Sequence, residues 1–313
     1  MLRTLALAPL TLLFACTEQE LPQTAEATIE YTLTRLHDEE DPGVLWDILP
    51  ASYQSDIHSW CHKLGAKLPG KAYDKLFILL RKIGIAIKTK GEFLLAYGPA
   101  QYLMRTTGIT DEDEVLTLLA AIGNVPILIG DSEISTTKKL QSADIGKFLH
   151  NTGTKVWAQG ARAYRAVGPA VSAMTKIAGG GMPMSSVVKG MNSGLDGLTF
   201  KTLKSEADRA QIELTLNGKT EPMAFTKVEE RWVPTDVVDQ WAKMKPSIES
   251  FLDSLESPET HKLMDDMEKI LDQMIADLDK LEAIQSRGKF FTALEKLSKN
   301  YVEQFKDIVT LPR

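Results

Sequence analysis

The side chains best suited to metal binding lie close together near residue 60. His58, Cys61 and His62 are spaced i, i+3 and i+4, so a helix would present them on one face. Histidines at i and i+4 hold zinc in some proteins, but Ser59 stands where the HExxH motif has its glutamate. We therefore predict packing or solvent contact for these three side chains, with a metal site as the alternative. The remaining histidines are scattered along the chain: His37, His150 and His261.

Serine–lysine pairs suggest a second kind of chemistry, nucleophilic catalysis. The S-x-x-K pattern of penicillin-recognising enzymes occurs at Ser135–Lys138, Ser186–Lys189 and Ser286–Lys289. Those enzymes also need S-x-N and K-[ST]-G elements further along, and the sequence lacks them in the required order. Because three matches in one chain show how easily the pattern arises, we predict no catalytic serine.

Glycine-rich and acidic segments are the places where a phosphate or a calcium ion could bind. Gly179-Gly180-Gly181 lacks the G-x-x-x-x-G-K-[ST] order, and we expect a linker between helices and a sheet there. The acidic runs 38–41 and 111–114 lack the spacing and glycine of a calcium loop. The sequence therefore predicts no cofactor. With 36 basic and 42 acidic residues, the net charge of -6 also argues against nucleic acid as a partner.

Helices are expected to position most of these groups. Thr24 is placed to cap a first helix, and Asp41-Pro42-Gly43 is placed to end it. Thr110 and the acids that follow predict the start of another helix, with Gly123 as its stop. Apolar spacing predicts further helical segments at 44–65, 71–88, 139–166 and 183–192, of which 71–88 has the composition of a core helix.

Residues 198–233 change to the period-2 pattern of β-strands. Asn217-Gly218 is a strong signal for a two-residue hairpin loop. Such a loop sets the register Ala210–Phe225, Ile212–Met223, Leu214–Glu221 and Leu216–Lys219. A preceding strand is expected at 198–203, and a short final one at Arg231-Trp232-Val233. Pro222 indicates that its strand bends or lies on an edge at that point.

The C-terminal segment predicts a helical hairpin. Ser257-Pro258-Glu259 starts a helix whose apolar residues recur by threes and fours: Met264, Met267, Leu271, Met274, Leu278 and Leu281. Arg287-Gly288 is expected to turn the chain into a second amphipathic helix. The apolar stripe of the first helix needs a partner, which is the other arm, the body of the protein or another protein. We favour packing within the chain.

The first sixteen residues, MLRTLALAPLTLLFAC, combine one positive charge with a short apolar run. The run is too short to span a bilayer and is typical of a secretory signal. Leu13-Phe14-Ala15-Cys16 resembles the lipobox of bacterial lipoproteins. The resemblance implies cleavage before Cys16, acylation of that cysteine and, since Thr17 follows, an outer-membrane location facing the periplasm. An ordinary cleaved signal and a buried N-terminal helix are the alternatives.

Acylation of Cys16 would leave Cys61 without a partner, because the chain has only two cysteines. We expect the Cys61 thiol to be buried, with a bridge between chains as the alternative. Elsewhere the sequence has no run of 18 apolar residues, so we expect no other segment to span a membrane.

The segment 198–234, which ends in KVEERWVP, resembles the closing strands of bacterial lipoproteins with a nuclear-transport-factor-like cone fold. The resemblance implies a curved sheet that wraps helices around a pocket. Functions within that fold range from isomerase to simple binding, so the resemblance implies no particular activity.

Charge is distributed unevenly near the N-terminus. Residues 27–57 carry seven acids and one arginine, whereas residues 58–91 carry eight basic residues and one acid. The simplest interpretation is that these two segments face each other. The alternative is a row of lysines that faces anionic lipid beside the anchor: Lys63, Lys67, Lys71 and Lys75.

Together these patterns predict an α+β protein, mainly α, with a small antiparallel meander. The expected divisions are a signal peptide at 1–15, a lipidated tether at 16–25, a helical domain at 26–192, the meander at 193–235 and a C-terminal helical hairpin at 236–313. The expected function is a membrane-anchored, non-enzymatic binding or scaffold module that contacts the lipid bilayer and envelope proteins. The alternatives are a carrier of a small apolar ligand in a sheet–helix pocket, or an enzyme.

Overall fold

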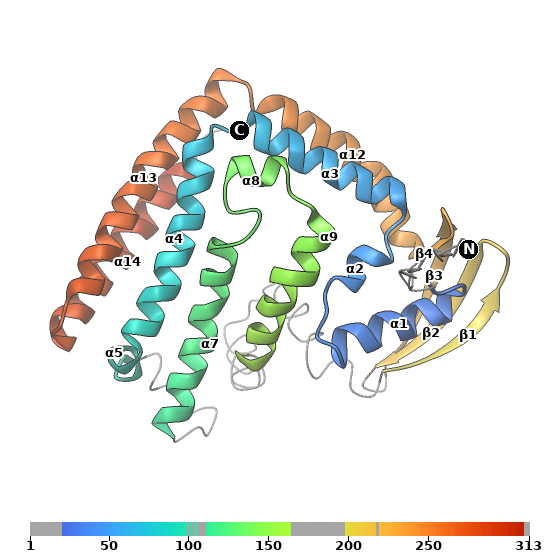
Figure 1. The fold of residues 1–313 in the computed structure, drawn as a ribbon, viewed down its shortest axis with the longest axis horizontal. Coiled ribbons are helices and arrows are strands. Elements are labelled where there is room, and N and C mark those ends of the chain that lie inside the picture. Colours follow the sequence, from blue (N-terminus) through green and yellow to red (C-terminus); the bar gives the residue numbers. More distant parts are fainter. Residues whose placement is uncertain are drawn as a thin grey trace, which may run out of the picture.

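The computed structural model describes residues 21–98, 101, 104, 111–163, 198–216 and 219–309. Within them, helices dominate and one antiparallel sheet lies at one end of the molecule (Figure 1). The predicted α+β, mainly α, fold class is therefore confirmed. The lipobox, the Gly179–Gly181 linker, the helix at 183–192 and the Ser186–Lys189 pair lie outside the described residues.

The first helix, α1 (Ala25–His37), packs on the sheet. Its start follows the predicted capping, because the Thr24 side chain accepts a hydrogen bond from the Ala27 amide at 3.1 Å. Ala25 is buried in a core cluster with Ile212 and Trp232. The N-terminal helix is thus attached to strands almost two hundred residues away in the sequence.

The sheet has the strand order β1-β2-β3-β4. The strands are β1 (Thr199–Ser205), β2 (Arg209–Leu216), β3 (Lys219–Val228) and β4 (Arg231–Pro234). All four predicted pairs between β2 and β3 are present, from Ala210–Phe225 to Leu216–Lys219. Pro222 lies opposite Glu213, outside the stretch of β3 that pairs with β4, so its missing amide faces an open edge as predicted.

The helical part is built around α4 (Gly70–Thr89), which lies between α7 (Glu112–Gly130) and α13 (Pro258–Ala283). The predicted stop at Gly123 is wrong, since α7 continues through it. Gly84 and Gly123 let the two backbones approach: a Cβ on Gly123 would lie 2.8 Å from the Gly84 carbonyl oxygen. The cap is Asp111 rather than Thr110, with its carboxylate accepting from the Asp113 amide.

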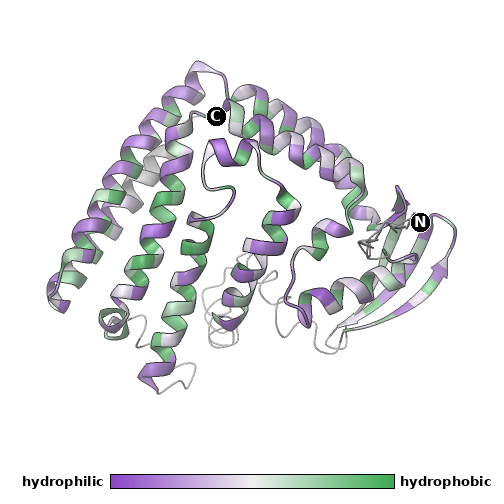
Figure 2. Ribbon diagram, in the orientation of Figure 1, coloured by the Kyte–Doolittle hydropathy of each residue, from purple (hydrophilic) through white to green (hydrophobic). Residues whose placement is uncertain are grey.

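Apolar residues follow α7 along most of its length (Figure 2). Among the described residues, this helix has the length and composition of a membrane span, with a mean hydropathy of 1.5. Its buried residues include Val115, Leu118 and Ala121, and it packs along α4. Packing on α4 therefore accounts for part of this apolar surface.

Short helices connect these long ones. They are α2 (Val44–Asp47), α5 (Gly91–Leu95), α8 (Thr137–Gln141), α9 (Ile145–Phe148) and the π-helical turn η1 (Leu149–Gly153). A further long helix, α3 (Ala51–Lys67), precedes α4. The chain stays helical after η1 up to residue 163, which agrees with part of the helix predicted at 139–166.

The C-terminal region contains α12 (Thr235–Ser254), α13 and α14 (Arg287–Val309), so the predicted hairpin is preceded by a further helix. Ser257 caps α13 as predicted, whereas the turn comes at 284–286, just before Arg287. The apolar stripe of α13 packs on the body: Leu271 lies in one core cluster with Ala72 and Leu79 of α4. The contact with α14 is much smaller than the contact with α4.

Candidate functional site

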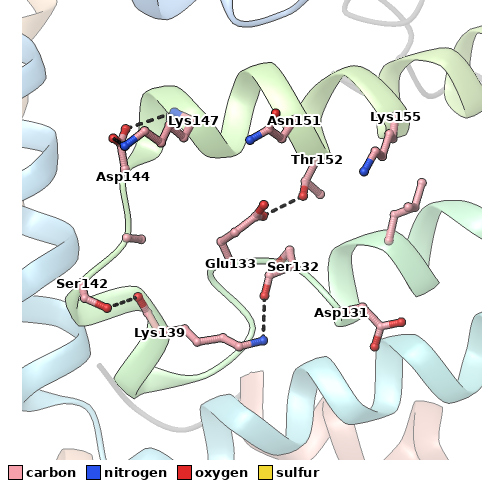
Figure 3. Close-up of a pocket in the computed structure, with 12 residues that line it drawn as sticks. Asp131, Ser132, Glu133, Lys139, Ser142, Asp144, Lys147, Asn151, Thr152 and Lys155 are labelled. Atoms are coloured by element: carbon pink, nitrogen blue, oxygen red, sulfur yellow. Dashed lines mark hydrogen bonds and ion pairs between the residues drawn. The ribbon is translucent and has the colours of Figure 1, made fainter.

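A polar pocket of about 620 Å³ opens beside the C-terminal end of α7. The loop after α7, then α8, α9, η1 and the helix that follows provide its walls (Figure 3). Most of its lining is charged or hydrogen-bonding: Asp131, Ser132, Glu133, Lys139, Ser142, Asp144, Lys147, Asn151, Thr152 and Lys155. Such a lining suits a polar ligand.

Ser135 and Lys139 form a hydrogen-bonded pair behind one wall. The Lys139 ammonium donates to Ser135 Oγ at 3.0 Å and to the Ser132 carbonyl oxygen at 3.1 Å. Ser135 is buried and donates its own proton to the same carbonyl at 2.8 Å. Because Lys139 donates and the hydroxyl proton is held by a carbonyl, this geometry shapes the loop and does not activate a nucleophile. Lys138 of the S-x-x-K pattern is exposed.

Some of the charges in the pocket are compensated. Asp131 pairs with Arg81 at 2.9 Å, and Asp144 pairs with Lys147 at 3.1 Å. Asp144 also caps α9 by accepting from the Lys147 amide. That backbone hydrogen bond, together with the Lys147 ammonium, lowers the pKa of Asp144.

Three further charges remain without an opposite charge within ion-pair distance among the described residues. The Glu133 carboxylate accepts a hydrogen bond from the neutral Thr152 hydroxyl at 2.6 Å. Lys139 donates to neutral oxygens, and Lys155 stands exposed on the helix after η1. Figure 3 shows Glu133 reaching Thr152 and Lys139 reaching Ser132 across the loop. The pocket can therefore offer one negative and two positive charges to a ligand.

The face of η1 opposite the pocket carries a second polar cluster. The His150 ring places Nδ1 3.1 Å from Asp41 Oδ2 and Nε2 3.1 Å from Asp47 Oδ1. Asp41 also accepts from the Gly43 amide at 2.8 Å and from the Arg35 guanidinium. These contacts join α1, α2 and η1, and we call Asp41, Asp47 and His150 the carboxylate–histidine clamp.

The surroundings shift the protonation of the clamp. Burial alone would lower the pKa of His150, but hydrogen bonds and charge from Asp47 and Asp41 outweigh it, so the pKa is raised. For the acid Asp41, burial alone would raise the pKa, but hydrogen bonds from Arg35, the Gly43 amide and His150 outweigh it, so the pKa is lowered. Both shifts stabilise the charged forms of His150 and Asp41.

His58, Cys61 and His62, the candidates for the alternative of a metal site, lie in different surroundings. His58 accepts a hydrogen bond from the Ile145 amide at 3.3 Å and contacts the Trp46 ring. His62 is exposed, and Cys61 is only half-buried, with a pKa raised by burial. Within the described residues, no group of three or more potential ligands is placed to hold a metal ion.

The predicted lysine row is divided. Lys67 pairs with Asp253 and Glu256 at 3.0 and 3.4 Å, and Lys75 pairs with Glu268 and Asp272 at 2.7 and 2.6 Å. Lys63 and Lys71 are exposed. The acids that pair with Lys67 and Lys75 therefore lie on α12, α13 and the loop between them rather than at 27–57.

Sequence reasoning missed both the pocket and the clamp. The sequence indicates Asp41 only as part of the break after the first helix, although the spacing Asp41-Pro42-Gly43 is that of an Asx-turn, in which the Gly43 amide donates to the Asp41 carboxylate. His150 carries no local signal, because its two partners lie more than a hundred residues away. A small cavity of about 10 Å³ lies beside Trp232, between α1 and β4.

Comparisons with protein-family models, curated proteins and solved structures found no match to this chain. The candidate site is therefore defined by its own geometry.

Proposed function

We propose that this protein is a membrane-anchored lipoprotein of the bacterial envelope and works as a binding module. The support for the anchor is the lipobox-like Leu13-Phe14-Ala15-Cys16 after a short apolar run. Three acyl chains would hold firmly, because each buried methylene contributes about 0.8 kcal/mol and a single chain binds only weakly.

The proposed anchor would enter at the sheet end of the molecule. Trp232 Nε1 of β4 donates to the Gln23 carbonyl oxygen at 2.8 Å and so holds the start of the described chain against the sheet. Leu21 follows Cys16 by five residues, which span at most about 18 Å when extended. The sheet would then lie next to the membrane, with α13 and α14 at the other end of the molecule (Figure 1).

The ligand that fits best is small and polar. The observation that carries this proposal is the set of three pocket charges without an opposite partner among the described residues: Glu133, Lys139 and Lys155. A ligand with one ammonium and two acidic groups, as in an acidic amino acid, would complement all three. The small cavity beside Trp232, of about 10 Å³, holds roughly one water.

Calorimetric titration with L-aspartate tests this proposal on the chain without its signal. We expect saturable binding that weakens in Lys155→Gln and in Glu133→Gln. Lys138→Gln is the matched control, because Lys138 is exposed next to Lys139 but does not line the pocket. Succinate, which lacks the ammonium, should bind less tightly than L-aspartate. Equal affinities for the wild type and both pocket variants would refute the assignment of this pocket.

The anchor is tested separately by the mass of full-length protein extracted in detergent from a Gram-negative host. A chain that begins at Cys16 and carries three acyl groups is expected. An unlipidated product cut at another position would refute the anchor and leave the pocket proposal standing.

A further inference from the structure

The geometry of the carboxylate–histidine clamp requires a protonated ring. Both nitrogens of His150 lie 3.1 Å from a carboxylate oxygen, one from Asp41 and one from Asp47. A neutral imidazole has a single N–H, so only the imidazolium donates to both sides. Loss of that proton would leave a ring lone pair facing one of the two carboxylates.

The neighbouring groups make this loss costly. Asp41 is shared with Arg35 and with the Thr154 hydroxyl, whose oxygen lies 3.4 Å from Asp41. Asp47 has its ion pair with His150 and no other among the described residues. The charged and titratable groups around the ring and its partners are Asp41, Asp47, Arg35, Glu39 and Tyr31. With Tyr31 neutral and the others ionised, the cluster carries about −1 when His150 is charged and about −2 when it is neutral.

The π-helical turn η1 connects the clamp to the pocket. His150 lies on the side of α2, whereas Thr152 is buried on the other side and donates to Glu133 at 2.6 Å. Single π-helical turns are rare and energetically marginal, so side-chain contacts at both faces hold this one in place. Gly43 provides room for the ring, since a Cβ there would lie 2.1 Å from Nδ1.

We propose that protonation of His150 controls ligand binding in the polar pocket. The charged ring holds η1 against Asp41 and Asp47, and η1 in turn holds Thr152 and Asn151 in the pocket wall. When the ring loses its proton, η1 separates from α2 and Thr152 releases Glu133. The protein with a protonated His150 ring is therefore the form that binds the ligand. This inference rests on the binding function proposed for the pocket.

The experiment measures L-aspartate affinity between about pH 5.5 and 8.5, a range that covers the ordinary pKa of histidine and the region above it. The charges of the probe do not change in that range. We expect the affinity of the wild type to fall roughly tenfold as the pH rises, in line with a modest coupling between sites. His150→Gln, whose amide stays neutral, should bind weakly and without pH dependence. His62→Gln is the matched control, because His62 is exposed and lies outside the pocket, and its pH dependence should equal that of the wild type.

A second measurement needs no ligand and no mutation. In the wild type, the backbone amide signals of Asn151 and Thr152 in an NMR pH titration should shift with the same midpoint as the His150 ring. The inference is overturned if these amide signals do not change as the His150 ring titrates, or if the L-aspartate affinity stays constant over the same pH range. If the amides follow the ring but L-aspartate does not bind at any pH, the coupling holds and only the proposed ligand fails.

Discussion

Gly43→Ala tests the carboxylate–histidine clamp by steric displacement alone. The Gly43 backbone, at φ −60° and ψ −24°, suits any residue, so the substitution adds no backbone strain. The new Cβ would, however, lie 2.1, 2.3 and 2.5 Å from three atoms of the His150 ring. An ordinary contact begins at 3.4 Å, so the ring must move by about 1.3 Å (3.4 minus 2.1). That shift disturbs the hydrogen bonds of both ring nitrogens, which now lie 3.1 Å from their carboxylates.

The energetic cost follows from those two contacts. A hydrogen bond to a charged group contributes roughly 1.5–3 kcal/mol when it is well buried. The His150 side chain is 35% exposed, so water replaces part of each contact and the figure must be reduced. We expect Gly43→Ala to lower the free energy of unfolding by about 1–2 kcal/mol near pH 6. The loss should shrink at high pH. The pKa of His150 is raised in the folded protein, so the ring stabilises the fold at pH values below the ordinary histidine pKa. That contribution disappears as the pH rises through the pKa of the folded state.

Urea unfolding at two pH values, combined with a double-mutant cycle, measures this effect. In the His150→Ala background the ring is gone, so Gly43→Ala should cost little, and the coupling energy should equal most of the single-mutant loss. A loss of the same size in both backgrounds would show that Gly43 acts without His150 and would refute the account of the clamp.

Other predictions concern the core and two titrating groups. Ile212 is fully buried in the sheet cluster, so Ile212→Ala should lower the free energy of unfolding, measured in urea, by about 2–5 kcal/mol. Leu203 is 47% exposed, so the control Leu203→Ala should change that free energy by less than about 0.5 kcal/mol. Hydrogen bonds from Gln273, Lys280 and Tyr301 lower the pKa of Asp277 to about 2. The stability that this group contributes is therefore present above its ordinary pKa and is lost as the pH falls towards the folded-state pKa. In Asp277→Asn, the free energy of unfolding should fall less steeply between about pH 4 and 2 than in the wild type. Burial raises the pKa of Tyr73 to about 12, so Tyr73→Phe should remove one tyrosine from the late part of an ultraviolet titration. A Tyr73 midpoint near 10 would contradict the buried contact to the Ile134 carbonyl oxygen.

Local signals determined much of the secondary structure. Thr24 and Ser257 cap helices because each places a side-chain oxygen beside free amides of the first turn, an interaction set within three residues. The register of β2 and β3 likewise follows from alternation and the two-residue loop, and the structure reproduces all four predicted pairs. Patterns with a short range in the sequence were therefore sufficient for these two helix starts and for the register of β2 and β3.

Contacts between distant segments were decided by the tertiary structure. Gly123 looked like a helix stop, yet packing against Gly84 keeps it inside α7, because close approach of two backbones outweighs the low helix propensity of glycine. Lysines of α3 and α4 pair with acids nearly two hundred residues away in the sequence. The apolar stripe of α13 packs on α4, because the fold brings these two helices side by side. His150 meets Asp41 and Asp47 only because η1 and α2 are folded together. A side chain's type sets which contacts it can make, whereas long-range packing decides which partner it reaches.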